Sequence, residues 1–599
     1  MKSFHRLLLG IALLGAATAH AQKNIANEEL DPASGTRLQV RSVFDPVPPS
    51  GYAPVRVVAT NGTGRNARWG FDFHSQTQYY RQQNEHRSSF ALDVPARSTQ
   101  SALFMVPLAV DYGDRTSGGT SGHVLRVDFS GTGFDVGSKY EHENRVTHRA
   151  ALALSETLAE FSITQLNKEM ESRLRSSSGG YYGGPVAFGS RFDVSDLPDS
   201  WLGYSGFDFI LLSSTDCQKL KPGVKRALLE WVRLGGTLHV YLSPGSLAAS
   251  LGLPGVTDAG SKVVSLGRIA FFGWDGKTLP AGETISRYWG ERPRLESLRT
   301  DHAASGSWPL LSLLGTRSFA SWQVIVFLVV FGMLVGPVNL FVLAPAGRRH
   351  KLFVTTPLLS IGASLVMVVL ILFQDGTGGT GRRFLAINLE PEEAAAYVTQ
   401  EQVSRTGVLL GAAFEMKQPV LIEPLSMPDT PWAKLKNSVN VQPADLTQDG
   451  RERRGNFFQS RAEQGQALRA AVSTRARMEL KAGAAPDAPP TLISALGFTV
   501  EELFYTDAAG AHWRLEKPLG TGQSATLLKA DDSAQRLWRE AAFDPAVSSL
   551  KTSLIRATTD RRPFFVAKAR QAPDFTLDTL SSIRWENDRI VVFGPVTQP

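Results

Sequence analysis

The chain has 599 residues, so at roughly 100–200 residues per domain we expect three or four folded units. Hydrophobic residues make up 43% and charged residues 20%, a composition that excludes an intrinsically disordered protein. The net charge is +7, but the basic residues are scattered, so we expect no nucleic-acid partner. Cys217 is the only cysteine, which excludes a disulfide-stapled fold and a zinc site with two or more thiolates.

Residues 1–21 have the pattern of a secretory signal peptide. Lys2 and Arg6 give a basic start, a short apolar run follows, and Ala19-His20-Ala21 fits the small-x-small cleavage pattern. An uncleaved anchor is the alternative, but the apolar run is too short to cross a bilayer comfortably. The pattern therefore predicts export, with the N-terminal part of the chain outside the cytosol.

Residues 36–145 are expected to form an immunoglobulin-like β-sandwich. Short β-branched and aromatic runs are separated by turn signals such as Asn61-Gly62, and the region has no helical period. Trp69, Phe71 and Phe73 alternate with other residues, so they fall on one face of a predicted strand. Regularly spaced short strands of this kind are typical of sandwich domains.

Residues 148–315 change to an α/β pattern. An apolar strand is expected at 207–213, an amphipathic helix at 224–234 and a second strand at 237–242. Strand, helix and strand at this spacing indicate a βαβ unit in a parallel sheet.

Two uncharged apolar stretches, 324–343 and 352–373, follow in the middle of the chain. Each is long enough to cross ~30 Å of hydrocarbon as a helix. The loop 344–351 between them carries Arg348, Arg349 and Lys351, and the positive-inside rule places such a loop in the cytoplasm. We therefore expect a two-helix transmembrane hairpin in the lipid bilayer, with the N- and C-terminal parts both periplasmic.

Two residues of the first stretch are expected to shape the hairpin. Pro337 lacks a backbone donor and should kink or loosen its helix. Asn339 is polar and should face the partner helix or the cytoplasmic interface.

Residues 384–599 are expected to form a β-rich periplasmic domain, interpreted as a second sandwich. A hairpin is predicted from 500–505 and 513–515, and a late strand from 589–593. Helical stretches are expected around 392–397 and 534–541. The sequence also predicts a glycine-rich linker at 376–381, just before this domain, and a strand with alternating apolar residues at 472–481.

Three stretches resemble a group of uncharacterised bacterial inner-membrane proteins with a glutamine-amidotransferase-like domain. They are GFDFILLSS with KPGVKRALLEWVRLGGTLHV (206–240), VGPVNLFVLAPAGRRHKLFVTTPLLS (335–360), and NFFQSRAEQ with LGFTVEELFYTDAAGAHWRL (456–515). The resemblance implies a flavodoxin-like α/β fold for 148–315. It also implies a catalytic cysteine in a sharp turn after a strand, where this chain has Ser243-Pro-Gly-Ser246, so we interpret the domain as a non-catalytic relative.

Three residues at predicted strand ends are candidates for ligand binding. Asp216 and Cys217 follow the strand at 207–213, and Ser243 follows the strand at 237–242, where α/β folds often bind ligands. Hydrogen bonding within the loop is the alternative for Asp216. Cys217 is either buried as a small apolar group or reactive. No catalytic triad, metal site or cofactor is predicted.

The sequence therefore predicts an exported bacterial inner-membrane protein whose periplasmic units bind or scaffold an envelope protein partner without catalysis. One alternative is a periplasmic hydrolase or amidotransferase with Cys217 or a serine near Ser243 as nucleophile and His239 as base. Another is an accessory subunit of an export or transport complex.

Overall fold

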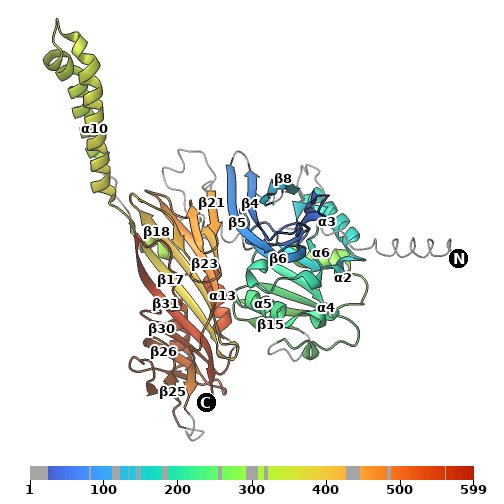
Figure 1. The fold of residues 1–599 in the computed structure, drawn as a ribbon. Helices are drawn as coiled ribbons and strands as arrows, with labels where there is room; N and C mark the ends of the chain where they lie inside the picture. Colours follow the sequence, from blue (N-terminus) through green and yellow to red (C-terminus); the bar gives the residue numbers. More distant parts are fainter. Residues whose placement is uncertain are drawn as a thin grey trace.

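The computed structural model combines a mixed α/β and β-rich body with two apolar helices that project from one end of it (Figure 1). This bears out the coarse fold expected from the sequence. The expected signal peptide lies outside the described residues, which are 24–79, 82–110, 122–132, 134–143, 146–147, 150–177, 186–253, 260–291, 294, 308–315, 321–425, 445–481, 488–559 and 561–598.

Two sheets form the N-terminal part of the body and share one core. The first has the order β1 (Asn24–Asp31), β2 (Thr36–Ser42), β3 (Tyr52–Asn61), β6 (Ser98–Pro107). The second has the order β19 (Phe414–Glu415), β22 (Glu452–Gly455), β21 (Asp445–Asp449), β5 (Gln82–Val94), β4 (Ala67–Tyr79), β7 (Gly122–Gly131), β8 (Phe134–Glu143). Trp69, Phe71 and Phe73 are buried in the shared core, as their alternation predicts.

The second of these sheets contains strands from both sides of the hairpin. β21 pairs in parallel with β5, with Asp445 opposite Glu85 and Asp449 opposite Ser89. A segment far along the chain therefore extends the sheet of the N-terminal part.

A six-stranded sheet forms the α/β part, in the order β12 (Ser190–Phe192), β10 (Leu152–Ser155), β13 (Phe209–Ser213), β14 (Thr237–Leu242), β16 (Gly267–Gly273), β15 (Ser261–Val264). All neighbours are parallel except β15, which is antiparallel to β16. The predicted βαβ unit is confirmed as β13, α5 (Pro222–Arg233) and β14. Small elements nearby are β9 (Val146–Thr147), β11 (Val186–Ala187), η1 (Val194–Asp196), η2 (Trp201–Tyr204) and η3 (Ala248–Leu251).

Helices cover both faces of this parallel sheet. α4 (Ser214–Lys219) and α5 pack through Cys217, Leu228 and Trp231 against Leu238 and Val240. On the opposite face lie α2 (Glu156–Ala159), α3 (Ile163–Ser177) and α6 (Ala281–Trp289), with buried side chains that include Leu158, Leu166 and Tyr288. All five residues of β13 are buried between the two helical layers, which suits its continuous apolar run.

A twelve-stranded sheet forms the part that follows the hairpin. Its main path is β20 (Val420–Leu425), β23 (Glu463–Ser473), β18 (Ala395–Thr406), β17 (Gly379–Glu390), β31 (Ile583–Thr597), β30 (Phe564–Ala569), β26 (Val500–Thr506), β27 (His512–Arg514), β29 (Leu528–Lys529), with β24 (Met478–Leu480), β25 (Thr491–Ser494) and β28 (Ser524–Thr526) attached. α8 (Pro309–Ser312), α12 (Asp532–Ala542) and α13 (Ser548–Thr559) share a core with β17 and β31. The expected β-rich character, the 500–515 hairpin and the 534–541 helix are confirmed.

Three local expectations for this part are wrong. The helix expected at 392–397 is a short 3-10 turn, η6 (Pro391–Glu393), followed by β18. The expected linker 376–381 already contains the start of β17. The strand expected at 472–481 is divided between the end of β23 and β24.

The apolar hairpin consists of α9 (Ser321–Met333), the π-helical η4 (Leu334–Leu343), the 3-10 turn η5 (Arg349–Lys351) and α10 (Leu352–Asp375). Both legs are long and apolar enough to cross a membrane, and only 6% and 0% of their spans are buried. Pro337 lies in the π-helical segment, in agreement with the predicted loosening. Asn339 Nδ2 donates a hydrogen bond to Thr356 Oγ1 at 2.9 Å, so Asn339 faces the partner helix as expected.

Candidate functional site

The carboxyl ends of β10, β13 and β14 bring the three predicted site residues to one edge of the parallel sheet. β13 ends at Ser213, and α4 starts directly with a capping box. Ser213 Oγ accepts a hydrogen bond from the backbone N of Asp216 at 3.1 Å, and the Asp216 carboxylate accepts one from the backbone N of Ser213 at 3.3 Å. A serine followed three residues later by an acidic residue is a local signal for such a helix start.

The Asp216 carboxylate is fully engaged by neighbouring hydroxyl groups. Ser155 Oγ donates to it at 2.6 Å, Thr157 Oγ1 at 2.8 Å and Ser213 Oγ at 2.7 Å, and the residue is 1% exposed. These hydrogen bonds join the end of β10 and the start of α2 to α4. Asp216 is therefore a buried brace, which is the hydrogen-bonding alternative expected from the sequence.

Cys217 is buried beneath this edge, at 4% exposure. Burial, and then the neighbouring Asp216 carboxylate, raise the pKa of the thiol to about 12. Since the thiolate is the nucleophilic form, a thiol with this pKa is inert at neutral pH. Of the two readings left open by the sequence, the small buried apolar group is the one that the structure supports.

Ser243 belongs to a chain of hydroxyl groups beside Asp216. Ser214 Oγ accepts a hydrogen bond from the backbone N of Ser243 at 3.1 Å, and it lies 3.2 Å from Ser243 Oγ and 3.1 Å from Ser246 Oγ. Ser214 is buried, whereas Ser243 and Ser246 are partly exposed. At this edge of the sheet, the partly exposed hydroxyl groups of Ser243 and Ser246 lie above the buried, fully hydrogen-bonded carboxylate of Asp216. Each hydroxyl can donate or accept a hydrogen bond with a polar ligand.

His239 lies on the opposite face of the sheet from Cys217. Its Nδ1 is 2.7 Å from the hydroxyl of Tyr288, and its ring packs against Phe209 and Phe272. Because side chains alternate along a strand, Leu238 and Val240 face the Cys217 side instead. Burial, and then Arg287, lower the pKa of His239 to about 3. Cys217 and His239, the thiol nucleophile and the base of the hydrolase alternative, are therefore separated by the sheet.

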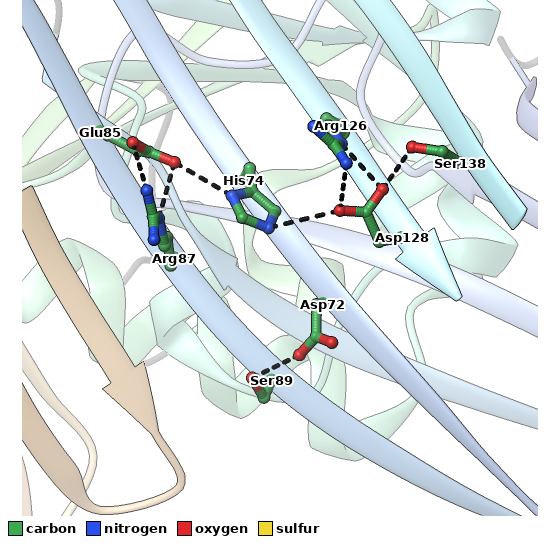
Figure 2. Close-up of polar contacts among 8 residues, drawn as sticks. All are labelled: Asp72, His74, Glu85, Arg87, Ser89, Arg126, Asp128 and Ser138. Atoms are coloured by element: carbon green, nitrogen blue, oxygen red, sulfur yellow. Dashed lines mark hydrogen bonds and ion pairs between the residues drawn. The ribbon is translucent and has the colours of Figure 1, made fainter. Parts of the chain in front are cut away.

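A second polar cluster, which sequence reasoning missed, lies on the outer face of the seven-stranded sheet (Figure 2). His74 of β4 stands between two carboxylates: Nδ1 is 3.0 Å from Glu85 Oε1 on β5, and Nε2 is 3.6 Å from Asp128 Oδ2 on β7. Arg87 Nε donates to Glu85 Oε1 and Arg126 Nε to Asp128 Oδ1, each at 2.7 Å. The available signal was the alternation of Asp72 and His74 with the apolar Phe71 and Phe73.

The charges of this second cluster neutralise one another. Hydrogen bonding from Arg87 lowers the pKa of Glu85 to about 2, although partial burial opposes the shift. Partial burial also opposes ionisation of Asp128, but hydrogen bonds from Arg126 and Ser138 lower its pKa below the usual range. The arrangement ties β5, β4, β7 and β8 together across a solvent-facing sheet. Among the described residues, no group of three or more His, Cys, Asp or Glu side chains is placed to hold a metal ion.

Comparisons with known proteins give no relative for this chain. No protein-family model and no curated protein matches it. Among solved structures, the sporulation control protein Spo0M from Bacillus subtilis is 13% identical, covers 18% of this chain and 47% of its own, and has a TM-score of 0.13. Beta-glucuronidase 2 from Bacteroides uniformis is 8% identical over 34% of this chain and 23% of its own, with a TM-score of 0.13.

A putative beta-galactosidase from Bacteroides fragilis is 10% identical, covers 36% of this chain and 40% of its own, and has a TM-score of 0.17. This chain thus spans less than half the length of each of these three proteins. TM-scores of this size carry no argument about fold or function.

Proposed function

We propose that this chain is a membrane-anchored, non-enzymatic binding or scaffold protein of the bacterial inner membrane, with its body in the periplasm. One observation carries the proposal: an apolar helical hairpin, almost entirely unburied, projects from a body built from the segments on both sides of it (Figure 1). A lipid bilayer is the partner that we propose for this hairpin.

The exposed side chains of the hairpin support insertion into lipid. Ile325, Val329, Leu358 and Leu365 are 59%, 59%, 70% and 62% exposed. Each would favour an apolar environment by about 1.5–3 kcal/mol if fully buried. The hydrogen bond from Asn339 to Thr356 pairs a polar amide nitrogen between the legs, as polar side chains in membrane helices often do across a helix pair.

The packing of the body supports an even number of crossings. Tyr397 and Leu421, which follow the hairpin, share a core with Leu228 and Trp231, which precede it. Trp308 and Leu310, just before the hairpin, are buried with Phe384 and Val591 beyond it. Segments that fold into shared cores must lie on the same side of a membrane, which favours two spans over one.

The charge of the loop and the N-terminal pattern support a periplasmic body. Arg348, Arg349 and Lys351 are exposed at the tip of the hairpin, where the positive-inside rule favours the cytoplasm. The signal-peptide pattern of residues 1–21 independently favours export of the part that precedes the hairpin.

We further propose that the body combines an immunoglobulin-like sandwich with a flavodoxin- or amidotransferase-like domain. Two sheets packed over one core support the first assignment. For the second, the parallel strands numbered in chain order stand as 2-1-3-4-5, the order of flavodoxin-like folds. The inert Cys217 and the distant His239 favour binding over catalysis, and an envelope protein is the expected partner.

The proposal is tested with reporter fusions to the full-length chain. Alkaline phosphatase at the C-terminus should be active, green fluorescent protein at the same place should be dark, and green fluorescent protein inserted at Gly347 should fluoresce. Leu365→Arg, in the second span, should release the protein from carbonate-washed membranes, whereas Leu528→Arg on the body should not. Fluorescence from the C-terminal fusion would refute the proposed topology. Crosslinking in intact cells, followed by identification of co-purified proteins, tests the partner.

A further inference from the structure

α10 joins the body at the end of the twelve-stranded sheet where β17 starts (Figure 1). α10 ends at Asp375, and the next residues are held by the loop that follows β18. Val408 N donates to Gly376 O at 2.9 Å, Gly378 N donates to Val408 O at 3.1 Å, and Gly407 N donates to Gly378 O at 2.7 Å. On the other leg, Arg405 donates to the carbonyl oxygens of Leu314 and Gly315, shortly before α9.

The loop 407–413 at this end of the sheet is uncharged and exposes one large apolar side chain. Its sequence is Gly-Val-Leu-Leu-Gly-Ala-Ala, and Leu409 and Ala412 pack against the core of the sheet. Leu410 points away from that core and is 92% exposed, more than Phe353 of the hairpin at 86%. A single exposed leucine is common on soluble proteins, so its position is what matters.

The chain path from the second apolar span to Leu410 limits the distance between Leu410 and the lipid. Phe373 is the last apolar residue of the second span, and Thr377, which bridges Val408, is four residues further. Four extended residues cover at most about 14 Å. Leu410 is two residues beyond Val408 and free of other apolar cover among the described residues. The bridge to Val408 adds about 5 Å and the two further residues about 7 Å, so this connection allows Leu410 to lie at the headgroup region.

An exposed aromatic residue lies near the body end of the other leg. Trp322 is 63% exposed in the first turn of α9. Tryptophan is enriched where a membrane helix leaves the hydrocarbon, because its ring is apolar and its N–H is polar. Trp322 thus lies at the body end of the first leg, and Leu410 lies on the loop that Val408 ties to the residues after α10.

We infer that the loop 407–413 inserts Leu410 into the headgroup and acyl boundary of the leaflet nearest the body, with Trp322 beside it. The inference rests on the proposed insertion of the hairpin. Peripheral apolar elements enter this boundary by about 5–10 Å. Together with the two legs, the loop gives a third point of contact with lipid, which fixes the orientation of β17 and β18 relative to the membrane.

The experiment measures the depth of a probe at position 410 in the full-length protein. Leu410→Cys is made in a Cys217→Ala background, labelled with an environment-sensitive fluorophore and reconstituted in vesicles of phosphatidylcholine and phosphatidylglycerol. Nitroxides are placed on the lipid headgroup, near the top of the acyl chain or near its end. A second variant carries Leu410→Cys and keeps Cys217. Because Cys217 is buried, the fluorophore should label only position 410 of this variant under native conditions.

Two matched positions calibrate the measurement. Leu365→Cys lies in the second span and should be quenched by the deep nitroxide. Leu528→Cys lies on β29, and the strand pairings place Leu528 in the same row of the sheet as Asn388 of β17. Asn388 is nine residues along β17 from Gly379, where β17 starts, which is a distance of about 30 Å. Leu528 is an exposed leucine, at 42%, and should not be quenched.

The probe at position 410 should show a blue shift and lose fluorescence to the shallow nitroxides. Quenching at 365 with no quenching at 410 would overturn the loop insertion and leave the anchored hairpin intact. A blue shift at 410 without lipid quenching would mean a protein contact and would also overturn it. Absence of quenching at 365 would refute the proposed membrane insertion, and the loop inference with it.

Discussion

Arg233 of α5 and Glu390 at the end of β17 form a buried ion pair, with 2.7 Å between Nη1 and Oε1, across the boundary between the α/β sheet and the sheet that follows the hairpin. The side chains are only 7% and 12% exposed. Arg233 also pairs with Glu393, and its guanidinium lies over the ring of Tyr397 at 5.6 Å. One side chain that precedes the hairpin is thus held by three that follow it.

Removal of Arg233 should loosen the contact between these two parts of the body. Arg233→Ala leaves Glu393 without this partner, and it leaves Glu390 with Arg561 as an ion-pair partner, 3.1 Å away, and with a hydrogen bond from the Asn388 amide. Loss of one member of a buried pair costs about 3–5 kcal/mol, and the remaining Arg561 favours the lower end. Hydrogen exchange of α5 and β18 should therefore accelerate by two or more orders of magnitude. Arg226→Ala on the same helix removes a long i,i+4 contact of 4.0 Å from an arginine that is 73% exposed, and it should change exchange very little.

Cys217 should behave as a buried, unreactive thiol. In the native protein at pH 8, a maleimide should label it far more slowly than after unfolding, because the pKa of the thiol is raised to about 12 from 9.0. A folded-state pKa above the unfolded one gives stability that is complete below pH 9 and is lost as the pH rises toward 12. In a strain that lacks the gene, Cys217→Ser should complement the deletion as well as the unchanged chain does. If the variant folds normally but fails to complement, thiol catalysis becomes a candidate again.

The elements that sequence predicted well are those with local signals. The run 207–213, the amphipathic stripe of Val224, Leu228 and Trp231, and the glycines that end the helix specify a βαβ unit without reference to the rest of the chain. The two apolar spans are equally local. The site residues Asp216, Cys217 and Ser243 were brought to one sheet edge because parallel strands align their carboxyl ends.

The elements that sequence missed depend on distant partners. Nothing near Asp445–Asp449 indicates that it pairs with β5, more than 350 residues earlier in the chain. Glu392, Glu393 and Ala395 favour a helix by propensity, but pairing of β18 with both β17 and β23 overrides it. At Gly381 the Trp585 ring of the neighbouring strand leaves no room for a Cβ. A glycine at this position therefore allows the close packing of β17 against β31, although glycine-rich segments usually indicate a linker.

Acidification should destabilise the body through His239. Its pKa falls to about 3 in the folded protein from an ordinary 6.5, so the unfolded chain binds the proton more tightly. A lowered pKa gives stability that is complete above pH 6.5 and is lost as the pH falls toward 3. His239→Phe should reduce the fall in melting temperature between pH 7.5 and pH 5, and His350→Phe in the exposed loop controls for the loss of a histidine. An unchanged slope in His239→Phe would place the acid sensitivity elsewhere, with buried His86 as the next residue to replace, since burial lowers its pKa to about 3.

The role of Asp216 can be separated from ligand binding by substitution. Asp216→Asn replaces one acceptor oxygen by a donor, although hydroxyl groups of Ser155, Thr157 and Ser213 all donate to this carboxylate. At least one buried hydrogen bond is then lost or opposed, at about 1–3 kcal/mol. The variant should therefore show a lower melting temperature and faster proteolysis near α4, whereas Ser243→Ala, at a partly exposed hydroxyl, should change both by much less. If Asp216→Asn were as stable as the unchanged chain but failed to complement a deletion, the carboxylate would be a binding group and the brace assignment would be wrong.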